Sequence, residues 1–361
     1  MDLELTDEQR WLSESVETLL SREWPAAESV TAATDEQRRR VWDELVAFGA
    51  LSIDAEEGIG AVEACLIARS LGAHLASAPF IGSAAARLAL GADGGFPEGA
   101  AVALALLESG SGSWLDEPAT VAWRAPENHY VVDGEKVGVE QADLAELVAL
   151  SARTEDGPAL VLAPTAAFRL EPRASFDPTL PISAASFRDL KVSGVSVVTG
   201  SAGRATLTRL QSAGAILAAA EASGAAETIL QLARDYAGER RQFGRSIASF
   251  QALRHLLADM YVRAASGFSA VLYAAAAFDE GAEDAQRTAS VAKAYVSRGA
   301  RQVAHGAMQV FGGIAFTDEH PAHRFLRRIT VRSQQFGDAA HHERALGRAL
   351  AAAAAPEVTA V

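Results

Sequence analysis

The 361-residue sequence predicts an α+β fold in three parts: an N-terminal helical domain, a middle antiparallel β domain and a C-terminal four-helix-bundle domain. Two observations lead to this order. Long segments with a helical spacing of apolar residues occupy both ends of the chain. Between them lie short runs rich in valine and leucine, which turn residues separate from one another. We therefore place the domain boundaries at 1–97, 98–203 and 204–361.

The N-terminal domain is expected to be helical throughout. Segment 5–24 has apolar residues at a helical spacing, namely Leu12, Val16, Leu19 and Leu20. Thr6 and Gln9 stand three residues apart at its start, which is the spacing of a capping box. A second helix is expected to end at Gly49, because glycine is a common C-cap. A third helix follows over 61–76.

The middle domain is predicted from its strands and turns. Short valine- and leucine-rich runs begin near Ala100 and recur up to about residue 200. Asp133-Gly134 and Asp156-Gly157 separate neighbouring runs, and both pairs favour turn conformations. Regular short strands divided by turn signals indicate a small antiparallel sheet.

Long helical segments return after the sheet, at 205–242, 249–281, 287–313 and 339–354. The first of them contains no proline and few residues that interrupt a helix. Long antiparallel helices with short connections are typical of a bundle, which is what we expect here.

Composition argues against several kinds of partner. The formal net charge is −14, so there is no basic surplus to bind nucleic acid or an anionic membrane surface. Cys65 is the single cysteine, so no intrachain disulfide can form and a cytoplasmic location is expected. The acidic N-terminus does not resemble a signal peptide. Glu221 interrupts the apolar stretch Ala213–Ala220, so we expect no membrane-spanning helix.

Three stretches make the chain resemble the acyl-CoA dehydrogenase family. They are 239–260, which begins ERRQFGR, 307–328, which begins AMQVFGG, and 176–192, FDPTLPISAASFRDLKV. The resemblance spans essentially the whole chain and implies the same order of helical, β and helical domains. Family members bind FAD at a subunit interface and remove a proton and a hydride from adjacent carbons of an acyl-CoA. Their electrons then pass to an electron-transferring flavoprotein.

The resemblance assigns one set of residues to the ADP half of FAD. In the family, an R-x-x-F-G and a Q-x-x-G-G motif reach the FAD held mainly by a neighbouring subunit. The matching positions in this chain are Arg240, Gln242, Phe243, Gln309, Val310, Phe311, Gly312 and Gly313. A guanidinium suits pyrophosphate, and glycine permits a close backbone approach. The alternative is that Arg240 is a solvated charge and the glycine pair only a helix end.

The seat of the flavin ring departs from the family pattern. Leu107 stands where the family has a ring-contacting threonine, and Trp114 replaces an aspartate although Ser113 is retained. Gly138 replaces the tryptophan and Glu140 the threonine of a second ring-contacting motif. A carboxylate beside the electron-rich edge of a reduced flavin would be repelled. We therefore expect this chain to hold the ring poorly.

Both positions at which the family carries its catalytic glutamate are occupied by other residues. One aligns with Gly337, and the other, on the first bundle helix, with Thr208. Arg209 matches the arginine that follows the second position, and the resemblance makes it a candidate substrate contact. Asp338 is the nearby carboxylate that could serve as the base. The alternative is that Asp338 is the N-cap of the last helix.

The same stretch carries a histidine pair that could suggest a metal. Asp338 and His342 stand at i and i+4, and His341 lies between them. Zinc normally takes three or four ligands, and the other histidines show no ligand spacing. We therefore expect no metal ion.

Three hypotheses follow from retained ADP motifs beside a missing base. The first is a subunit that completes the FAD site of a partner carrying the catalytic glutamate. Some actinobacterial members of the family, particularly those acting on steroid side-chain CoA thioesters, are α2β2 tetramers of this kind. The second is a homo-oligomeric dehydrogenase using Asp338 as base. The third is a flavin-free acyl-CoA-binding or scaffold protein.

Overall fold

A computed structural model describes residues 4–24, 34–52, 59–91, 94–110 and 118–354. Its first helices confirm the sequence prediction and add a fourth: α1 (Asp7–Glu23), α2 (Asp35–Ala47), α3 (Ala61–His74) and α4 (Phe80–Leu90). The capping box at the start of α1 is formed in both directions. The Thr6 hydroxyl accepts from the Gln9 amide at 3.2 Å, and the Thr6 amide donates to the Gln9 side chain at 3.0 Å.

The middle domain is one eight-stranded sheet with the order β6-β7-β3-β2-β4-β5-β8 and β1 beside β4. Its strands are β1 (Val102–Ala105), β2 (Val121–Ala125), β3 (His129–Glu140), β4 (Leu147–Thr154), β5 (Gly157–Pro164), β6 (Arg169–Arg173), β7 (Ile182–Ser193) and β8 (Val197–Val198). The sheet is mixed rather than purely antiparallel, because β1 and β2 each pair with β4 in parallel. The chain between β1 and β4 is long enough for the crossover that parallel pairing requires.

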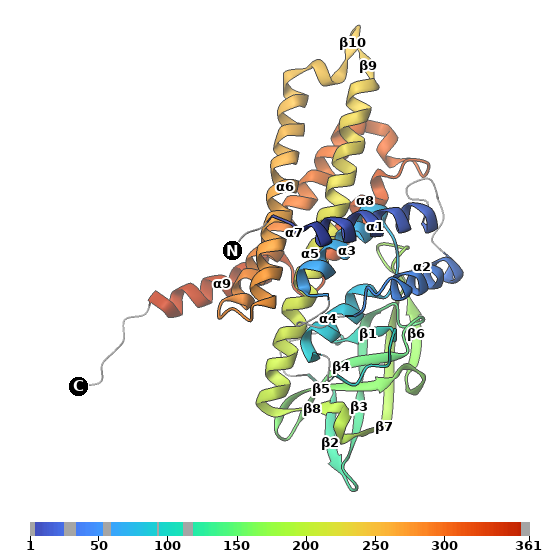
Figure 1. Ribbon diagram of the computed structural model, residues 1–361, viewed down its shortest axis with the longest axis vertical. Coiled ribbons are helices and arrows are strands. Elements are labelled where there is room, and N and C mark those ends of the chain that lie inside the picture. Colours follow the sequence, from blue (N-terminus) through green and yellow to red (C-terminus); the bar gives the residue numbers. More distant parts are fainter. Residues whose placement is uncertain (1–3, 25–33, 53–58, 92–93, 111–117, 355–361) are drawn as a thin grey trace, which may run out of the picture.

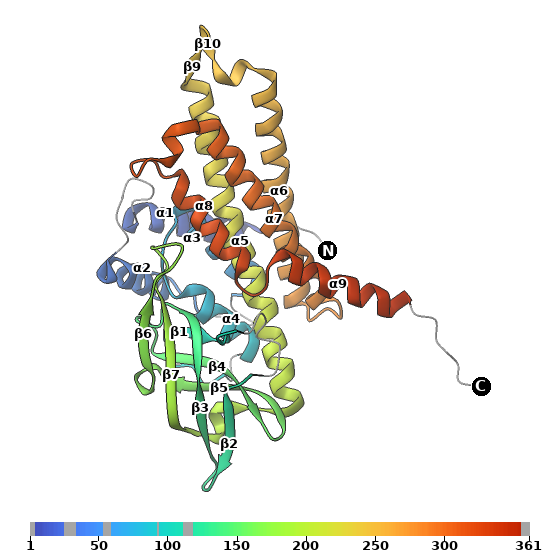
Figure 2. The same cartoon turned by 180° about the vertical axis from the view of Figure 1, so that it is seen from behind.

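The C-terminal part is a bundle of long helices with a hairpin at one end. The elements are α5 (Gly200–Glu239), β9 (Arg241–Gln242), β10 (Arg245–Ser246), α6 (Gln251–Asp279), α7 (Ala285–Phe311), α8 (Ala322–Gln334) and α9 (Ala339–Ala354). Helix α8 was not among the predicted helical segments. The β9–β10 hairpin lies at the end of the bundle farthest from the sheet, and α9 projects from the body (Figures 1 and 2).

Helix α5 joins all parts of the molecule. It runs from the sheet to the hairpin (Figure 1), so the predicted boundary at 203/204 falls inside it. Buried residues of α1–α4 and of the bundle belong to one core around α5, and the sheet has a second core. By length and composition α5 could cross a membrane, but 89% of its apolar window is buried inside the protein.

Two glycines allow α3 and α5 to pack with their backbones in contact. A Cβ added at Gly72 of α3 would lie 1.9 Å from the carbonyl oxygen of Glu221 on α5. A Cβ added at Gly224 of α5 would lie 1.9 Å from the carbonyl oxygen of Arg69 on α3. Any larger residue at either position must therefore push the two helices apart.

A buried arginine next to this contact connects four parts of the chain. Arg328 of α8 donates to Asp177, before β7, at 2.7 Å and to Glu221 of α5 at 2.8 Å. Its guanidinium also donates to the carbonyl oxygens of Leu75 and Ala76, at 3.1 and 2.9 Å, after α3. Burial raises the pKa of Asp177, but the charge of Arg328 brings it below the ordinary value. The network fixes α8, and with it the chain that follows α8.

Gly224→Ala is expected to destabilise the protein because its methyl group meets backbone atoms of α3. The expected loss is about 1–3 kcal/mol, the range for overpacked sites. Gly238 is the matched control, since it lies on the same helix and a Cβ there meets nothing within 4 Å. Gly238→Ala should be neutral or stabilising by up to about 1 kcal/mol. Urea unfolding of both variants measures the difference, and equal midpoints would contradict the packing argument.

Candidate functional site

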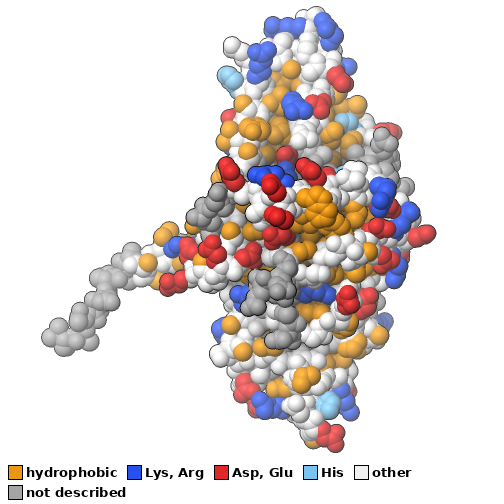
Figure 3. Space-filling model, viewed as in Figure 1, with side chains coloured by type: hydrophobic (Ala, Val, Ile, Leu, Met, Phe, Trp, Pro, Cys, Tyr) orange, Lys and Arg blue, Asp and Glu red, His pale blue; other side chains and the backbone are white. Residues whose placement is uncertain are grey.

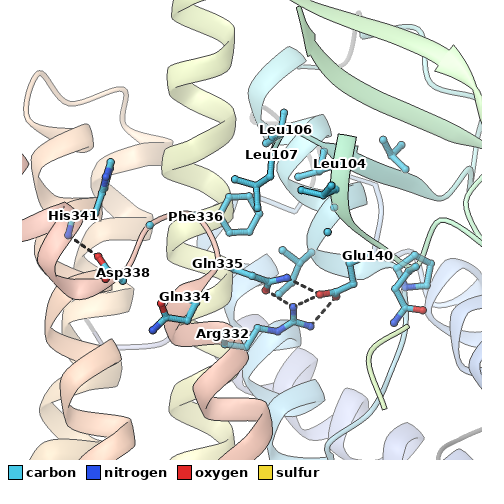
Figure 4. Close-up of a pocket in the computed structure, with 18 of the residues that line it drawn as sticks. Leu104, Leu106, Leu107, Glu140, Arg332, Gln334, Gln335, Phe336, Asp338 and His341 are labelled. Carbon is cyan, nitrogen blue, oxygen red and sulfur yellow. Dashed lines mark hydrogen bonds and ion pairs between the residues drawn. The ribbon is translucent and has the colours of Figure 1, made fainter. Parts of the chain in front are cut away.

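A cavity of about 360 Å³ lies between the sheet and the bundle. Its walls come from the start of α4, from β1 and the residues after it, from β3, and from the chain between α8 and α9. The lining residues are Pro79, Ile81, Gly82, Val102, Leu104, Leu106, Leu107, Val137, Gly138, Glu140, Gln141, Arg332, Gln334, Gln335, Phe336, Gly337, Asp338, His341 and Arg344. Figure 4 shows aliphatic side chains on one side and polar residues of the α8–α9 connection on the other. The cavity therefore contains the positions that the resemblance assigns to the flavin ring and to the base.

The described ring-contacting positions on the sheet side carry no hydroxyl or aromatic group; they are Leu107, Gly138 and Glu140. Leu107 forms an isolated bridge with Val137, whose amide donates to the Leu107 carbonyl oxygen at 2.9 Å. Gly138, where the family has tryptophan, has φ of +65°, a conformation that side-chain-bearing residues rarely adopt. A Cβ there would first meet the Leu107 side chain, at 3.7 Å. Ser113 and Trp114 lie outside the described residues.

Glu140 has hydrogen-bond partners that the sequence did not indicate. Arg332 of α8 donates to its two oxygens, at 2.7 and 3.0 Å, and Gln335 donates at 2.6 Å (Figure 4). Burial acts to raise the pKa of Glu140, and the Arg332 guanidinium outweighs it and holds the pKa below its ordinary value. The charge is neutralised inside the protein, and the pair links β3 to α8.

The glutamate position after α8 cannot hold a side chain without rearrangement. Gly337 has φ of +95°, and a Cβ there would lie 2.7 Å from the His341 ring. Asp338 lines the cavity, and its carboxylate accepts the His341 amide at 2.7 Å (Figure 4). Asp338 therefore caps α9, which is one of the two roles that the sequence suggested for it. Phe336, with φ of +54°, packs against Gly214 of α5, where a Cβ would lie 2.3 Å from its ring.

The second glutamate position, on α5, lies away from the cavity. Thr208 is half-buried, and its hydroxyl donates to the Arg204 carbonyl oxygen at 2.9 Å. Arg209 donates to the Leu88 carbonyl oxygen at 3.0 Å, and its guanidinium lies 4.7 Å from the centre of the Phe278 ring. Neither Thr208 nor Arg209 lines the cavity, so the cavity geometry gives no support to Arg209 as a substrate contact.

The residues assigned to the ADP half of FAD gather at the hairpin end of the bundle. Arg240 and Gln242 are exposed, and Phe243 is 91% exposed with φ of +53°. Figure 3 shows Lys and Arg side chains clustered at this end of the molecule. None of these residues lines the cavity, so they face outward rather than toward the site of their own chain.

The second ADP motif, at the end of α7, is only partly exposed. The exposed residues are Gln309, Gly312 and Gly313, and a Cβ on either glycine would meet no described atom within 4 Å. Val310 and Phe311, by contrast, are buried side chains of the bundle core. The Phe311 ring lies 5.4 Å from Tyr236 of α5 and 4.4 Å from His320. Their side chains therefore do not reach the surface, and a contact of these two residues with FAD, which would involve their backbone, stays a prediction.

Lys293 of α7 is a buried charge that sequence reasoning missed. Its amine donates to the carbonyl oxygens of Arg332 and Ser333 at 2.9 and 3.1 Å, and to the Ser297 hydroxyl at 3.1 Å. Burial lowers its pKa to about 7, although the Asp338 carboxylate acts in the opposite direction. A lysine within an otherwise apolar helical stripe was the available signal. Lys293 thereby holds the last turn of α8, and the chain that closes the cavity follows directly after this turn.

His342 has a hydrogen-bond partner inside the protein. Its Nε2 lies 2.9 Å from the Phe336 carbonyl oxygen and therefore donates to it. Within the described ranges, no three histidine, cysteine, aspartate or glutamate side chains come together as a metal site would require. The pair of Asp338 and His342 thus shapes the loop that closes the cavity.

The described residues fit one half of FAD and not the other. The exposed hairpin arginines and open glycines suit a pyrophosphate or adenosine group presented by another chain. The cavity offers the ring two aliphatic residues, a glycine and an already satisfied ion pair at the positions described above. At these described positions, a flavin ring would meet no hydroxyl group and no aromatic face.

His342 is expected to make the folded state sensitive to acid. Burial, with Lys293 as a second cause, lowers its pKa to about 4 from an ordinary 6.5. The unfolded chain therefore binds the additional proton between these values, and stability falls as pH drops from about 6.5 to about 4, by up to about 3 kcal/mol. His342→Gln should remove this component in urea unfolding measured between pH 7 and pH 5. His255→Gln, on the exposed face of α6, should keep it, and identical pH profiles of the two variants would refute the assignment.

Comparison with known proteins identifies the family of this chain. Residues 203–351 match the family model of the acyl-CoA dehydrogenase C-terminal domain. Acyl-CoA dehydrogenase IpdE2 of Mycobacterium tuberculosis is 31% identical over 331 residues, which cover 89% of this chain and 91% of that protein.

Solved structures show the same fold over nearly the whole chain. A chain of the ChsE4-ChsE5 complex from Mycobacterium tuberculosis superposes with a TM-score of 0.83 at 25% identity, covering 97% of this chain and 99% of that one. A chain of the Tcur3481-Tcur3483 steroid ACAD gives a TM-score of 0.83 at 24% identity, covering 96% and 99%. With a matching family model and a relative similar over almost its full length, this chain belongs to the acyl-CoA dehydrogenase family.

Proposed function

We propose that this chain is a subunit of a hetero-oligomeric, FAD-dependent acyl-CoA dehydrogenase. It lacks the catalytic glutamate itself and completes the FAD site of a partner subunit that carries one. The reaction is the α,β-dehydrogenation of an acyl-CoA thioester, in which FAD accepts the hydride. Electrons then pass to an electron-transferring flavoprotein, and the assembly works in the cytoplasm.

One observation carries the proposal: this chain keeps the ADP motifs of the family but has other residues at the flavin-ring and base positions. Gly337 in the cavity and Thr208 on α5 occupy the two base positions, and Gly138 and Glu140 replace ring-contacting residues. The ADP motifs remain, and Arg240 and its neighbours are exposed at the far end of the bundle. A chain that binds FAD only for itself would have no use for one half without the other.

In this role, the hairpin supplies binding and orientation rather than proton transfer. Arg240 would pair with the pyrophosphate of the partner's FAD by charge-assisted hydrogen bonds. Phe243, which is 91% exposed in the single chain, would be covered by the cofactor or by the partner. Gly312 and Gly313 would let the backbone approach closely. The carboxylate that removes the α-proton belongs to the partner.

The substrate proposal is a steroid side-chain CoA thioester. It draws on the similar Tcur3481-Tcur3483 protein, which is described as a steroid ACAD, and on the similar chain in the two-component ChsE4-ChsE5 complex. An acyl-CoA bound to the partner fits the family chemistry, and the steroid group is the narrower part of this proposal.

Two other functions have a structural observation in their favour. Asp338 lines the cavity, so a homo-oligomeric dehydrogenase could use it as the base. The largely aliphatic wall of the same cavity would also suit a flavin-free acyl-CoA-binding or scaffold protein. The experiments below separate these two from the heteromeric subunit.

The chain purified alone should contain no flavin, and the chain co-expressed with its partner should contain about one FAD per heterodimer. The partner to use is an acyl-CoA dehydrogenase chain encoded beside this one. Absorbance near 450 nm per chain and native mass measure both quantities. Arg240→Ala should weaken FAD retention in the complex by tenfold or more, because it removes a charge-assisted contact.

Arg234→Ala is the matched control for that variant. Arg234 is an exposed arginine on α5, six residues before Arg240, and it pairs with Asp235 at 2.9 Å. The control should retain FAD as the wild type does. One FAD per chain in the protein alone would favour the homo-oligomer, and no flavin in any complex would favour the flavin-free protein.

Asp338→Asn in the flavin-containing complex is expected to keep turnover close to the wild-type value. Asparagine caps a helix about as well as aspartate but cannot accept the α-proton. Steady-state turnover with an acyl-CoA is the measurement, and unfolding of the variant checks that the cap is preserved. A loss of a hundredfold or more without a loss of stability would instead identify Asp338 as the base.

A further inference from the structure

A charged pair stands at the position where family members contact the flavin ring. Glu140 takes the place of a ring-contacting threonine, and Arg332 reaches it from the other side of the cavity (Figure 4). We propose that Glu140, Arg332 and Gln335 fill the flavin-ring seat of this chain, exclude flavin from it and join the sheet to the bundle in its place. The inference rests on the proposed function for the identity of the seat, but it concerns this chain alone.

The three side chains form a closed set of hydrogen bonds. Arg332 donates to both carboxylate oxygens of Glu140, and Gln335 donates to the Oε2 atom that also accepts from Arg332. The Gln335 side-chain oxygen in turn accepts from Arg332 at 2.5 Å. Every member of the set lines the cavity, so the set occupies the wall rather than a site behind it.

The set cannot easily swing away to admit a ligand. Arg332 is 2% exposed, and its Nε atom lies 2.9 Å from a carboxylate oxygen of Glu221 on α5. Lys293 holds the Arg332 backbone by donating to its carbonyl oxygen at 2.9 Å. A ring that displaced the Glu140 side chain would part the buried Arg332 guanidinium from one of its carboxylate partners, which is strongly unfavourable.

The local backbone supports the same conclusion. The left-handed φ of Gly138 disfavours any residue with a side chain at the position of the ring-stacking tryptophan. Leu107 is the nearest neighbour of that position. The ion pair thus lies next to a stretch that already lacks the aromatic face of a flavin site.

The pair also supplies a link that a bound cofactor would otherwise provide. It connects residue 140 at the end of β3 to residue 332 in α8, and these positions are 192 residues apart in the chain. The sheet and the bundle are therefore joined across the cavity by protein atoms alone. On this basis, the folded chain does not require flavin for its stability.

The test uses lumiflavin and riboflavin, which carry the flavin ring without the ADP half. The test variant is the double substitution Glu140→Thr with Arg332→Leu, which removes both charges together. The matched control is Arg298→Leu with Glu343→Thr, an exposed arginine–glutamate pair between α7 and α9 at 2.5 Å. Quenching of flavin fluorescence measures binding to each purified chain.

Wild type and control should show no saturable binding, and the double variant should bind lumiflavin at least tenfold more tightly than wild type. Saturable binding to wild type at one ring per chain would overturn the proposal. A folded double variant that gains no affinity would overturn it as well. If that variant does not fold by circular dichroism, Glu140→Gln with Arg332→Met keeps the side-chain lengths and is judged by the same criterion.

These outcomes are separate from the fate of the proposed function. The titration uses the isolated chain and a ring that has no ADP half, so neither a partner nor the hairpin influences it. A heteromer without flavin would refute the proposed function and leave this result unchanged. A wild-type chain that binds lumiflavin would refute the filled seat and leave the partner's FAD site unaffected.

Discussion

The ion pairs of the buried Arg328 are the interaction on which the arrangement of this molecule depends. One guanidinium satisfies carboxylates from α5 and from the chain before β7, and two carbonyl oxygens after α3. A buried carboxylate left without its cation would be strongly destabilising, so these segments must assemble together. The helical ends of the chain share one core for the same reason, although the sheet separates them in the sequence. The position of α8 that results sets the course of the loop that closes the cavity.

A row of buried ion pairs runs from Arg328 to the wall of the cavity. Glu221 pairs with both Arg328 and Arg332, and Arg332 also pairs with Glu140 on the sheet. Lys293 adds a further cation behind the end of α8, where it is held by backbone oxygens. Each carboxylate in this row has a cation within hydrogen-bonding distance. The chain therefore keeps a polar interior at the place where relatives hold a cofactor, and the interior is satisfied by the protein itself.

Sequence reasoning recovered the features that local patterns determine. The capping box of Thr6 and Gln9 and the long bundle helices follow from spacing within a few residues. The two ADP motifs come from the family resemblance, and their role stays a prediction. The parallel pairing of β1 with β4 and the partners of Arg332 depend on segments far apart in the chain, which periodicity does not encode. Helix α8 was missed although Ala322, Phe325 and Ile329 recur at a helical spacing. The sequence did not indicate the cation that pairs with Glu140, because Arg332 lies 192 residues away in the chain.

The backbone at the two vacated positions has a consequence for how this chain can evolve. Gly138 and Gly337 both adopt left-handed conformations, and the second is crowded by His341. A single mutation back to tryptophan or glutamate would meet strain before it contributed a contact. A threonine at 140 alone would remove one of the two carboxylates that pair with the buried Arg332. Each single substitution toward the family residues thus passes through a less stable chain. Under the proposed function, the folded structure itself opposes the conversion of this subunit into a self-sufficient enzyme one substitution at a time.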